Sequence, residues 1–323
     1  MAFNVRYLDS DLYSGPNNTL AVNAVRVYYD GKHYDLPQVV PTKVELDYAD
    51  QIDQPLTNPI YQYIYKPRNI ESLRDPETVV RETNKYRRYL ARYGPLGDFY
   101  LQSSKENQLP NGLRNIVNQI QFNAGAKFIS DLEPNREQTV QSFAQQITAA
   151  ENRYPDNIVV PTIDIETQQT GRFGEKLDWA IDHGCKKINV ISRAIRPNIS
   201  NWIDLSRSIH KKNVWINAIG ILPRYHMTSR ISSISAAFLF GVHTASLAVP
   251  WRGSENAMPY IFNPRTHTFN LDANVTYPQS RTSSVESMSN DLIIARRHIL
   301  GHTYFDDYVA RRQGLQNTLD SIA

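Results

Sequence analysis

The sequence predicts an α/β protein that folds as a TIM-type (β/α)8 barrel, and two observations lead to this prediction. From residue 58 onward, strand-like and helix-like segments alternate about eight times, which is typical of parallel βαβ units. Several predicted strands also end in polar residues, which a barrel would bring together at one mouth. We therefore expect a β-rich cap at residues 1–57 and a barrel with a C-terminal helical extension at residues 58–323. A doubly wound open sheet is the alternative architecture.

The predicted cap contains a hairpin, and the first barrel strand follows it. In "AVRVYYDGKHYDL", Asp30 and Gly31 stand between two strand-like runs, which is a strong signal for a tight β-turn. In "PIYQYIY" the tyrosines alternate with other residues, which is the spacing of a strand. We expect their rings to cover a half-buried sheet; stacking on nucleic-acid bases is the less favoured alternative.

The predicted strands of the barrel are short apolar runs, each followed by a helical pattern. They are "IYQYIY" (60–65), "DFYLQSS" (98–104), "AKFISDLE" (126–133), "NIVVPTIDIE" (157–166), "KKINVIS" (186–192), "NVWINAIGI" (213–221), "AAFLFGVHTASL" (236–247) and a weaker one in "THTFNLD" (266–272). The stretch "PQSRTSS" at 278–284 is rich in turn residues and predicts an exposed loop. The remainder of the C-terminus has a strongly helical pattern.

Composition excludes several classes of protein. With 41% hydrophobic and 21% charged residues, the chain of 323 residues can build a substantial core. Its formal net charge of +3 permits a nucleic-acid or other polyanionic partner without requiring one. The single cysteine, Cys185, excludes a disulfide framework within the chain and a zinc site made of several cysteines. We see no signal-peptide pattern and no apolar run long enough to span a bilayer, and we expect a cytoplasmic protein without a membrane partner.

The strand "VVPTIDIET" at 159–167 carries two carboxylates on one face. Side chains alternate along a strand, so Asp164 and Glu166 lie on the same side. Asp131 and Glu133 end the preceding strand in the same way, so a cluster of four acids is predicted at the mouth. Such a cluster suits glycosidic chemistry, in which one carboxylate acts at the anomeric carbon and another transfers protons, or the binding of a divalent metal. The alternative for Glu133 is a helix cap.

Basic residues follow the later strands. Arg193 comes after one strand and Arg252 after another, and both are candidates to hold phosphate because arginine forks match its geometry. Ordinary salt bridging, including a pair between Glu166 and Arg193, is the alternative. The helix "KYRRYLARYG" at 85–94 mixes arginines and tyrosines and could lie against a nucleic-acid backbone. We favour a solvated helix with an aromatic inner stripe there.

Common cofactor and catalytic motifs are absent. The chain has no Walker A loop, no G-x-G-x-x-G, no H-E-x-x-H and no G-x-S-x-G motif. Its eight histidines show no metal-ligand spacing. We therefore predict neither a resident metal ion nor an organic cofactor.

Over roughly residues 95–320, the order of segments resembles the tRNA-guanine transglycosylase superfamily, whose barrel enzymes exchange guanine for a 7-deazaguanine in tRNA or DNA. "KFISDLEPNREQTVQSFAQQI" is similar to the family strand that ends in a base-reading acid, which implies that Asp131 contacts the purine edge. "IVVPTIDIET" stands at a base-contacting strand, and "FLFGVHTASLAVPWRGS" is similar to the nucleophile strand. The N-terminal hairpin region matches the family's β cap.

The chain departs from the family pattern at its catalytic positions. The nucleophilic aspartate of the family falls near 244–246, where this sequence has no acid. The general-base aspartate falls near Gln102, again without an acid, and the zinc-binding cysteines are missing. The resemblance therefore implies an enzyme whose carboxylates have moved, or a member without catalysis.

The leading functional prediction is a transglycosylase-like barrel that exchanges guanine or a 7-deazaguanine at the N-glycosidic bond of a nucleic acid. Its partners would be tRNA or DNA and a purine or 7-deazaguanine base; a homodimer is among the options for its oligomeric state. The first alternative is a catalytically inert barrel that binds nucleic acid or a partner subunit, and the second is a metal-dependent or glycoside hydrolase. The predicted catalytic residues are Asp164 (nucleophile or electrostatic stabiliser), Glu166 (proton transfer) and Asp131 (hydrogen bond to the base), and the predicted substrate-binding residues are Glu133, Gln102, Ser103, Arg193 and Arg252.

Overall fold

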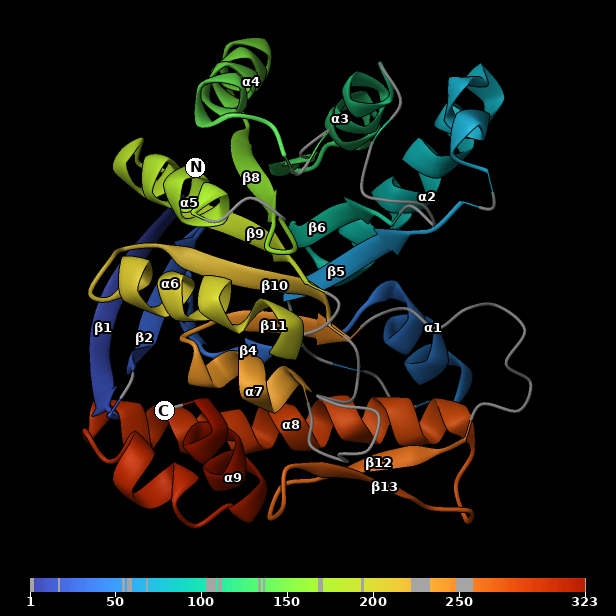
Figure 1. Cartoon of the computed structure of the whole chain (residues 1–323). Coiled ribbons are helices and arrows are strands. Elements are labelled where there is room, and N and C mark those ends of the chain that lie inside the picture. Colours follow the sequence, from blue (N-terminus) through green and yellow to red (C-terminus); the bar gives the residue numbers. More distant parts are fainter. Residues whose placement is uncertain are drawn as a thin grey trace. The chain divides into compact units, whose positions relative to one another are not determined.

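A computed structural model shows a mixed α/β protein whose parallel strands alternate with helices (Figure 1). The described residues are 3–16, 18–53, 56, 60–67, 69–102, 109, 112–132, 135, 137–167, 171–192, 195–221, 233–247 and 258–322. They form two compact units, residues 57–190 and residues 1–56 with 191–323. The predicted division into a cap at 1–57 and a barrel at 58–323 remains a prediction.

The unit of residues 57–190 consists of parallel strands with helices between them, as the alternation predicted. Its strands are β5 (Ile60–Tyr65), β6 (Leu96–Leu101), β7 (Phe128–Leu132), β8 (Ile158–Asp164) and β9 (Lys187–Ile191), the last of which ends at the unit boundary. Its helices are η1 (Ile70–Arg74), α2 (Pro76–Tyr93), α3 (Leu113–Ala124), α4 (Val140–Arg153) and α5 (Arg172–Asp182). Strand β5 pairs in parallel with β6, and β7 pairs in parallel with β8.

Local sequence explains where these helices begin and end. Asp75 accepts hydrogen bonds from two backbone amides of the first turn of α2, and Pro76 follows at a position where its missing N–H is not needed. The helix ends at Gly94, which has a φ of 107°. On the inner side of α2, the ring of Tyr86 packs against the ring of Phe99 of β6, with 5.2 Å between the two ring centroids. Helix α2 therefore covers this face of the strand. The β5 tyrosines lie deeper than the half-buried sheet that was predicted, since Tyr63 is 1% exposed.

The unit of residues 1–56 and 191–323 begins with an antiparallel sheet. Strands β1 (Phe3–Ser14), β2 (Thr19–Tyr29) and β3 (Lys32–Leu36) pair in the order β1-β2-β3. The predicted hairpin turn is confirmed between β2 and β3. Asp30 and Gly31 adopt φ values of 50° and 74° there, the left-handed conformation that a tight hairpin turn requires.

The same unit holds three neighbouring parallel strands, in the order β4-β11-β10. The strands are β4 (Gln38–Val39), β10 (Trp215–Ile221) and β11 (Thr244–Leu247). The helices are α1 (Lys43–Gln51), η2 (Arg196–Asn198), α6 (Ile199–Ile209), α7 (Ser233–Leu239), α8 (Tyr277–Leu300), a π-helix (Tyr304–Val309) and α9 (Gln313–Ile322). The strands of the described residues form no closed sheet.

Two predicted strands differ in the structure. The strand predicted at 266–272 is β13 (Thr268–Leu271), which pairs antiparallel with β12 (Tyr260–Asn263) in a separate hairpin and is not part of the parallel sheet. The strand predicted at 236–247 is shorter, because its first residues belong to α7 and the strand begins at Thr244. An apolar run of this length does not show by itself where a helix ends and a strand begins.

The prediction of an exposed loop at 278–284 is wrong. These residues form the first turns of α8, because Thr276 and Gln279 form a capping box and Pro278 fits the first turn. Arg281 is buried and forms an ion pair with Glu45. The buried partners inside the unit, which the local sequence does not display, turn an apparently polar stretch into a helix. None of the described helices has the length and apolar composition needed to cross a membrane.

Candidate functional site

A cluster of buried polar side chains lies on one face of the parallel strands in the unit of residues 57–190. We call this cluster, formed by Asp98 of β6, Ser130 of β7, and Lys187 and Asn189 of β9, the polar strand face. The hydroxyl of Ser130 donates to Asp98 Oδ1 at 3.4 Å, and the amide of Asn189 donates to Ser130 Oγ at 3.2 Å. Lys187 forms an ion pair with Asp98. Three strands are thus joined by a continuous chain of polar contacts.

The Asp98–Lys187 pair is enclosed. Lys187 is fully buried, and its Nζ lies 4.1 Å from the centre of the Phe128 ring. Burial disfavours charge on both groups: it raises the pKa of Asp98 and lowers the pKa of Lys187 to about 8, and the mutual attraction of the pair offsets part of each change. Because neither group reaches solvent, we assign the pair to the positioning of β6 and β9 rather than to contact with a substrate.

Asp164 lies on this same face, at the C-terminal end of β8. In the parallel ladder Ser130 is opposite Val160 and Leu132 is opposite Thr162, so Asp164, two residues on, points to the side of Ser130. Its side chain is only 2% exposed. The backbone amide of Glu166 donates to Asp164 Oδ1 at 2.9 Å, which fixes the chain as it leaves the strand. Strand β8 ends at Asp164, so Glu166 lies beyond it, and the pairing of the two carboxylates stays a prediction.

Asp131 points to the opposite face, so the prediction that it converges with Asp164 is wrong. It stands opposite Pro161 in the ladder and directly follows Ser130 in the strand, so its side chain points to the face opposite to that of Ser130. Two nitrogens of Arg114 donate to its carboxylate at 2.7 Å each, and Asn118 donates at 2.6 Å. Gln146 of α4 donates at 3.1 Å. The carboxylate is fully buried between β7 and the helices and serves to attach them to the strand.

Apart from the acids, Gln102 is the predicted site residue that falls within the described part of the chain. Its backbone amide donates to the carbonyl of Tyr65 at 2.8 Å and so extends the β5–β6 ladder by one residue. Its side-chain oxygen is buried and accepts no hydrogen bond from the described residues. A buried acceptor without a donor is costly in a folded protein, and a ligand N–H would satisfy it. The predicted binding residues that lie outside the described residues are Glu133, Ser103, Arg193 and Arg252.

The sequence reasoning did not identify the Asp98–Lys187 pair. Lys187 and Asn189 are two residues apart in an otherwise apolar strand, and Asp98 interrupts the apolar run of β6. Polar residues at alternate positions of a fully buried strand are the signal that could have found them. Their common burial depends on contact between two residues that are 89 positions apart in the chain.

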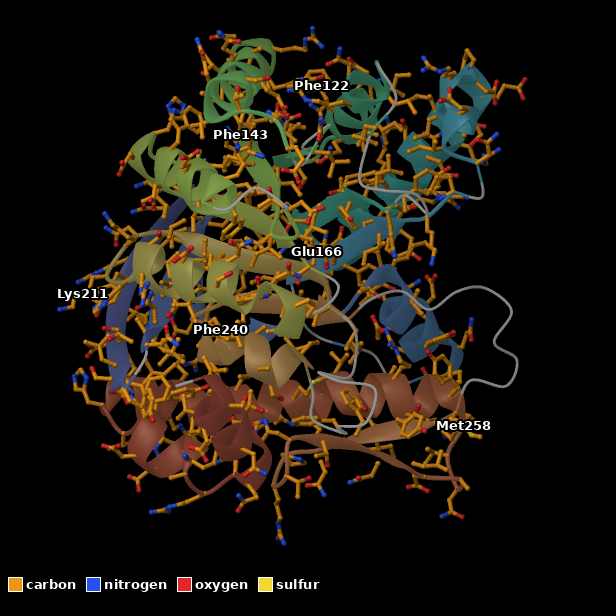
Figure 2. The ribbon with its side chains drawn as sticks, in the orientation of Figure 1. Phe122, Phe143, Glu166, Lys211, Phe240 and Met258 are labelled. Atoms are coloured by element: carbon orange, nitrogen blue, oxygen red, sulfur yellow. The ribbon has the colours of Figure 1, made fainter. Side chains whose placement is uncertain are left out.

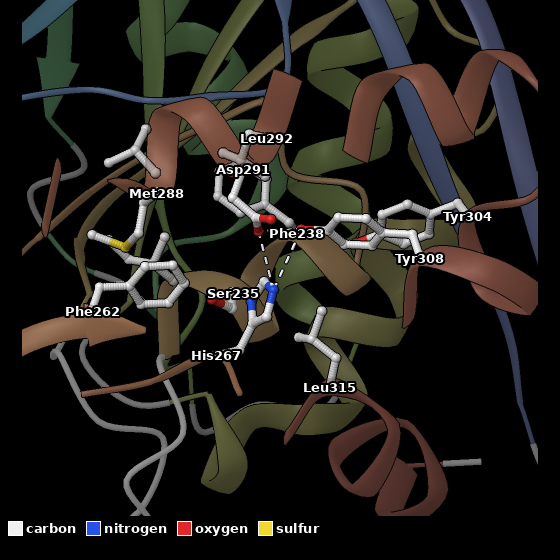
Figure 3. Close-up of a pocket in the computed structure, with 12 residues that line it drawn as sticks. Ser235, Phe238, Phe262, His267, Met288, Asp291, Leu292, Tyr304, Tyr308 and Leu315 are labelled. Atoms are coloured by element: carbon white, nitrogen blue, oxygen red, sulfur yellow. Dashed lines mark hydrogen bonds and ion pairs between the residues drawn. The ribbon is translucent and has the colours of Figure 1, made fainter. Parts of the chain in front are cut away.

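A second buried polar cluster lies in the unit of residues 1–56 and 191–323 (Figure 3). His267 Nε2 is 3.1 Å from Asp291 Oδ2, and Tyr308 donates to the same carboxylate oxygen. Arg312 donates to the other oxygen of Asp291 at 2.9 Å. The free space among these side chains is about 10 Å³, enough for one water molecule at most. The cluster therefore ties the β12–β13 turn to α8 and the C-terminal segment and leaves no room for a substrate.

Among the residues that the structure describes, no group of three or more His, Cys, Asp or Glu side chains is arranged to hold a metal ion. No protein-family model and no curated protein matches the chain. It is similar to a solved protein structure from Aquifex aeolicus VF5, with a TM-score of 0.45 and 9% identity, over 80% of this chain and 94% of that one.

Proposed function

We propose that this chain is a transglycosylase-like enzyme that exchanges a purine-type base at the N-glycosidic bond of a nucleic acid. The observation that supports it is Asp164, a buried carboxylate at the C-terminal end of a parallel strand, next to Glu166. Glycosidic chemistry needs one carboxylate at the sugar carbon and one group for proton transfer, and this pair offers both.

We further propose that the strands form a (β/α)8 barrel, with β4 as its first strand. Counted from β4, eight strands follow one another along the chain up to β11. Each of the first seven is followed by a helix, and the β12–β13 hairpin stands between β11 and α8. Strand β4 pairs in parallel with β11, through Gln38 with Thr244 and Val39 with Ala245. A pairing of the first strand with the last is what closure of a barrel requires. In such a barrel the C-terminal end of β8, with Asp164, faces the mouth at which barrel enzymes bind their substrates.

The proposed reaction has two displacements at the sugar carbon. The Asp164 carboxylate attacks C1′, the bond from C1′ to the base nitrogen breaks, and the departing base takes a proton from Glu166. The incoming base then attacks C1′ through its ring nitrogen, its proton passes to Glu166, and the bond to Asp164 breaks. The side-chain oxygen of Gln102, which accepts no hydrogen bond from the described residues, would accept one from an N–H of the base.

An inert barrel that binds nucleic acid is the second candidate. It is favoured by the commitment of Asp131 to Arg114, Asn118 and Gln146, which removes one predicted contact with the base. It is also favoured by Thr244, which stands where the transglycosylase family would carry an acid. The Thr244 hydroxyl accepts from the indole of Trp215 at 2.7 Å and donates to Asn217 at 2.8 Å, contacts that stabilise the strand pair.

A base-exchange assay tests the proposal. The protein is incubated with radiolabelled guanine or a 7-deazaguanine and, separately, with bulk tRNA and duplex DNA, and the label in the nucleic acid is counted. We expect Asp164→Asn to lower incorporation by about 10² to 10³-fold or more, because it removes the charge that acts at the sugar carbon. The matched control is Asp156→Asn, which neutralises an exposed acid of the same unit and should leave incorporation unchanged.

The outcomes separate the two candidates. Equal incorporation by the wild type and the Asp164→Asn variant would rule out the assignment of Asp164. If the wild type incorporates no label yet binds the nucleic acids, the inert barrel is the correct reading.

A further inference from the structure

The β12–β13 hairpin is attached to α8 along one edge only. The amide of Phe262 donates to Ser284 Oγ at 3.0 Å, and the hydroxyl of Ser284 donates to the carbonyl of Tyr260 at 3.4 Å. Strand β12 therefore has α8 along one edge and β13 along the other. Strand β13 is the outer strand of the hairpin and lies on the far side of β12 from α8 (Figure 1).

Strand β13 presents backbone polar groups at its outer edge. In an antiparallel ladder, facing residues alternate between pairs that exchange both hydrogen bonds and pairs that exchange none. Because the backbone groups of Tyr260 and Phe262 point to α8, those of their ladder partners, Leu271 and Phe269, point away from β12. No described residue bonds the backbone N–H or C=O of Phe269 or Leu271. We call these two residues the open β13 edge, which is a template for another strand.

The side chains around the open β13 edge are apolar near its middle and charged at its ends. Leu271 is 51% exposed, and Met258, which precedes β12, is 59% exposed (Figure 2). Arg265 stands beyond one end of β13 and Asp272 beyond the other, and both line an open groove of about 540 Å³ on the hairpin. Neither side chain forms an ion pair within the described residues.

We propose that the open β13 edge pairs with the same edge of a second copy of this chain, so that two hairpins form one four-stranded antiparallel sheet. A two-fold axis at Asn270 places Phe269 of each copy opposite Leu271 of the other. These are the residues whose N–H and C=O point outward, so each of the two symmetric pairs exchanges both hydrogen bonds. The exposed Leu271 side chains are covered at the same time.

The charges favour a second copy over an unrelated extended peptide. Two antiparallel strands run in opposite directions, so the end of β13 that carries Arg265 in one copy meets the end that carries Asp272 in the other. The two-fold axis repeats this meeting of opposite charges on both sides of the sheet. The edge is thus complementary to itself in its backbone groups and in its charges.

The length of the edge sets the strength of the association. Strand β13 has four residues, and an edge of this length buries less surface than a permanent dimer interface. We therefore expect a reversible dimer whose population rises with protein concentration.

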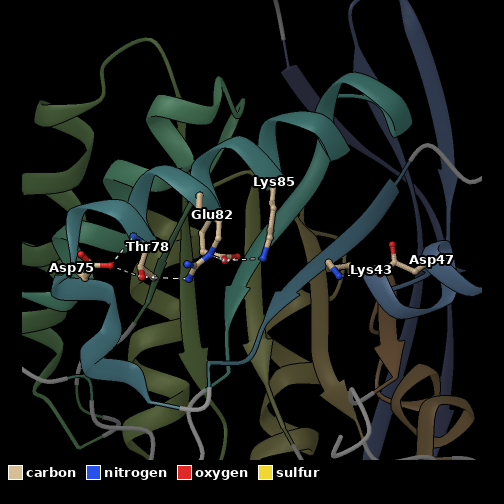
Figure 4. Close-up of polar contacts among 7 residues, drawn as sticks. Lys43, Asp47, Asp75, Thr78, Glu82 and Lys85 are labelled. Carbon is tan, nitrogen blue, oxygen red and sulfur yellow. Dashed lines mark hydrogen bonds and ion pairs between the residues drawn. The ribbon is translucent and has the colours of Figure 1, made fainter.

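The test is sedimentation equilibrium over a range of protein concentrations. R265D or D272R alone places like charges together at both symmetric contacts and should raise the dissociation constant of the dimer roughly tenfold. R265D/D272R exchanges the two charges and should restore the wild-type value. The matched control is K43D/D47K, which exchanges the charges of an ion pair on α1 of the same unit (Figure 4) and should leave the dissociation constant unchanged.

A proline variant tests the backbone pairing directly. L271P removes an N–H that the β12–β13 ladder does not use, so the variant should fold, with urea unfolding as the check, and should associate more weakly than L271A, which keeps that N–H. Failure of R265D/D272R to recover overturns the antiparallel arrangement. A dimer that neither L271P nor the charge reversals weaken forms through another surface and overturns the inference. A wild type that stays monomeric at every concentration overturns it too and leaves the edge to an extended segment of a different protein.

Discussion

The Asp98–Lys187 pair shows how a buried charge is tolerated in this chain. Lys187 and Asp98 are both enclosed, and each would be strongly disfavoured as a lone ion. Ser130, Asn189 and the ring of Phe128 surround the pair with further favourable contacts. The pair is thus acceptable only as a complete network.

We predict that breaking the pair is more damaging than removing it. Lys187→Met should lower the free energy of unfolding by about 3 kcal/mol, because it leaves an uncompensated carboxylate in the interior. The Asp98→Asn, Lys187→Met double variant should lose clearly less than the sum of the two single variants. Urea unfolding of the four proteins measures this cycle. Additive losses would show that the two groups do not interact.

At the scale of elements, the N-terminal end of α8 depends on its cap. Thr276 Oγ1 accepts from the amide of Gln279 at 3.4 Å, and Gln279 Oε1 accepts from the amide of Thr276 at 2.9 Å. This reciprocal pair starts a helix in a stretch whose composition predicts a loop. The start of α8 then positions Arg281 against Glu45 of α1.

Removing the cap should destabilise the protein measurably. We expect Thr276→Ala to lower the free energy of unfolding by about 1 kcal/mol, because the first-turn amide loses its acceptor. Thr276→Ser retains the hydroxyl and should stay close to the wild type. The midpoint of urea unfolding provides the comparison. A Thr276→Ala midpoint equal to that of the wild type would mean that the cap does not hold the helix.

At the scale of the whole molecule, residues far apart in the chain complete the core of the unit of residues 1–56 and 191–323. Asp11 of β1 accepts from the amide of Tyr304 at 2.6 Å, and Asn18 donates to the carbonyl of Ile322 at 2.8 Å. His243, beside β11, accepts from the amide of Ile216 at 2.9 Å and is fully buried. The stability of this unit therefore depends on groups contributed by both ends of the chain.

His243 should make the protein less stable in acid. Burial lowers its pKa to about 3, whereas an unfolded histidine titrates near 6.5. Below pH 6.5 the unfolded state binds the proton and the folded state does not, so stability falls by about 1.4 kcal/mol for each pH unit of acidification. His243→Asn keeps an acceptor for the amide of Ile216. Its unfolding free energy should fall less steeply between pH 6 and 4 than that of the wild type, whereas parallel curves would contradict the prediction.

The sequence by itself determined most elements and the strand that carries the candidate site. Alternation of apolar segments located the strands β5 to β10 and the helices between them, and the Asp30 and Gly31 turn located the hairpin. It also placed Asp164 at the end of β8, because the apolar run and its end are local properties of the sequence.

Only the tertiary structure decided which acids lie together. A shift of one residue in the β7–β8 register moves a side chain to the other face, and this puts Asp131 against Arg114 while Asp164 points to the side of Ser130. Strand β4 has two residues and no local signal, so its pairing with β11 was visible only once both were in place. Register and long-range pairing depend on contacts between segments that are distant in the chain, and local periodicity carries no information about them.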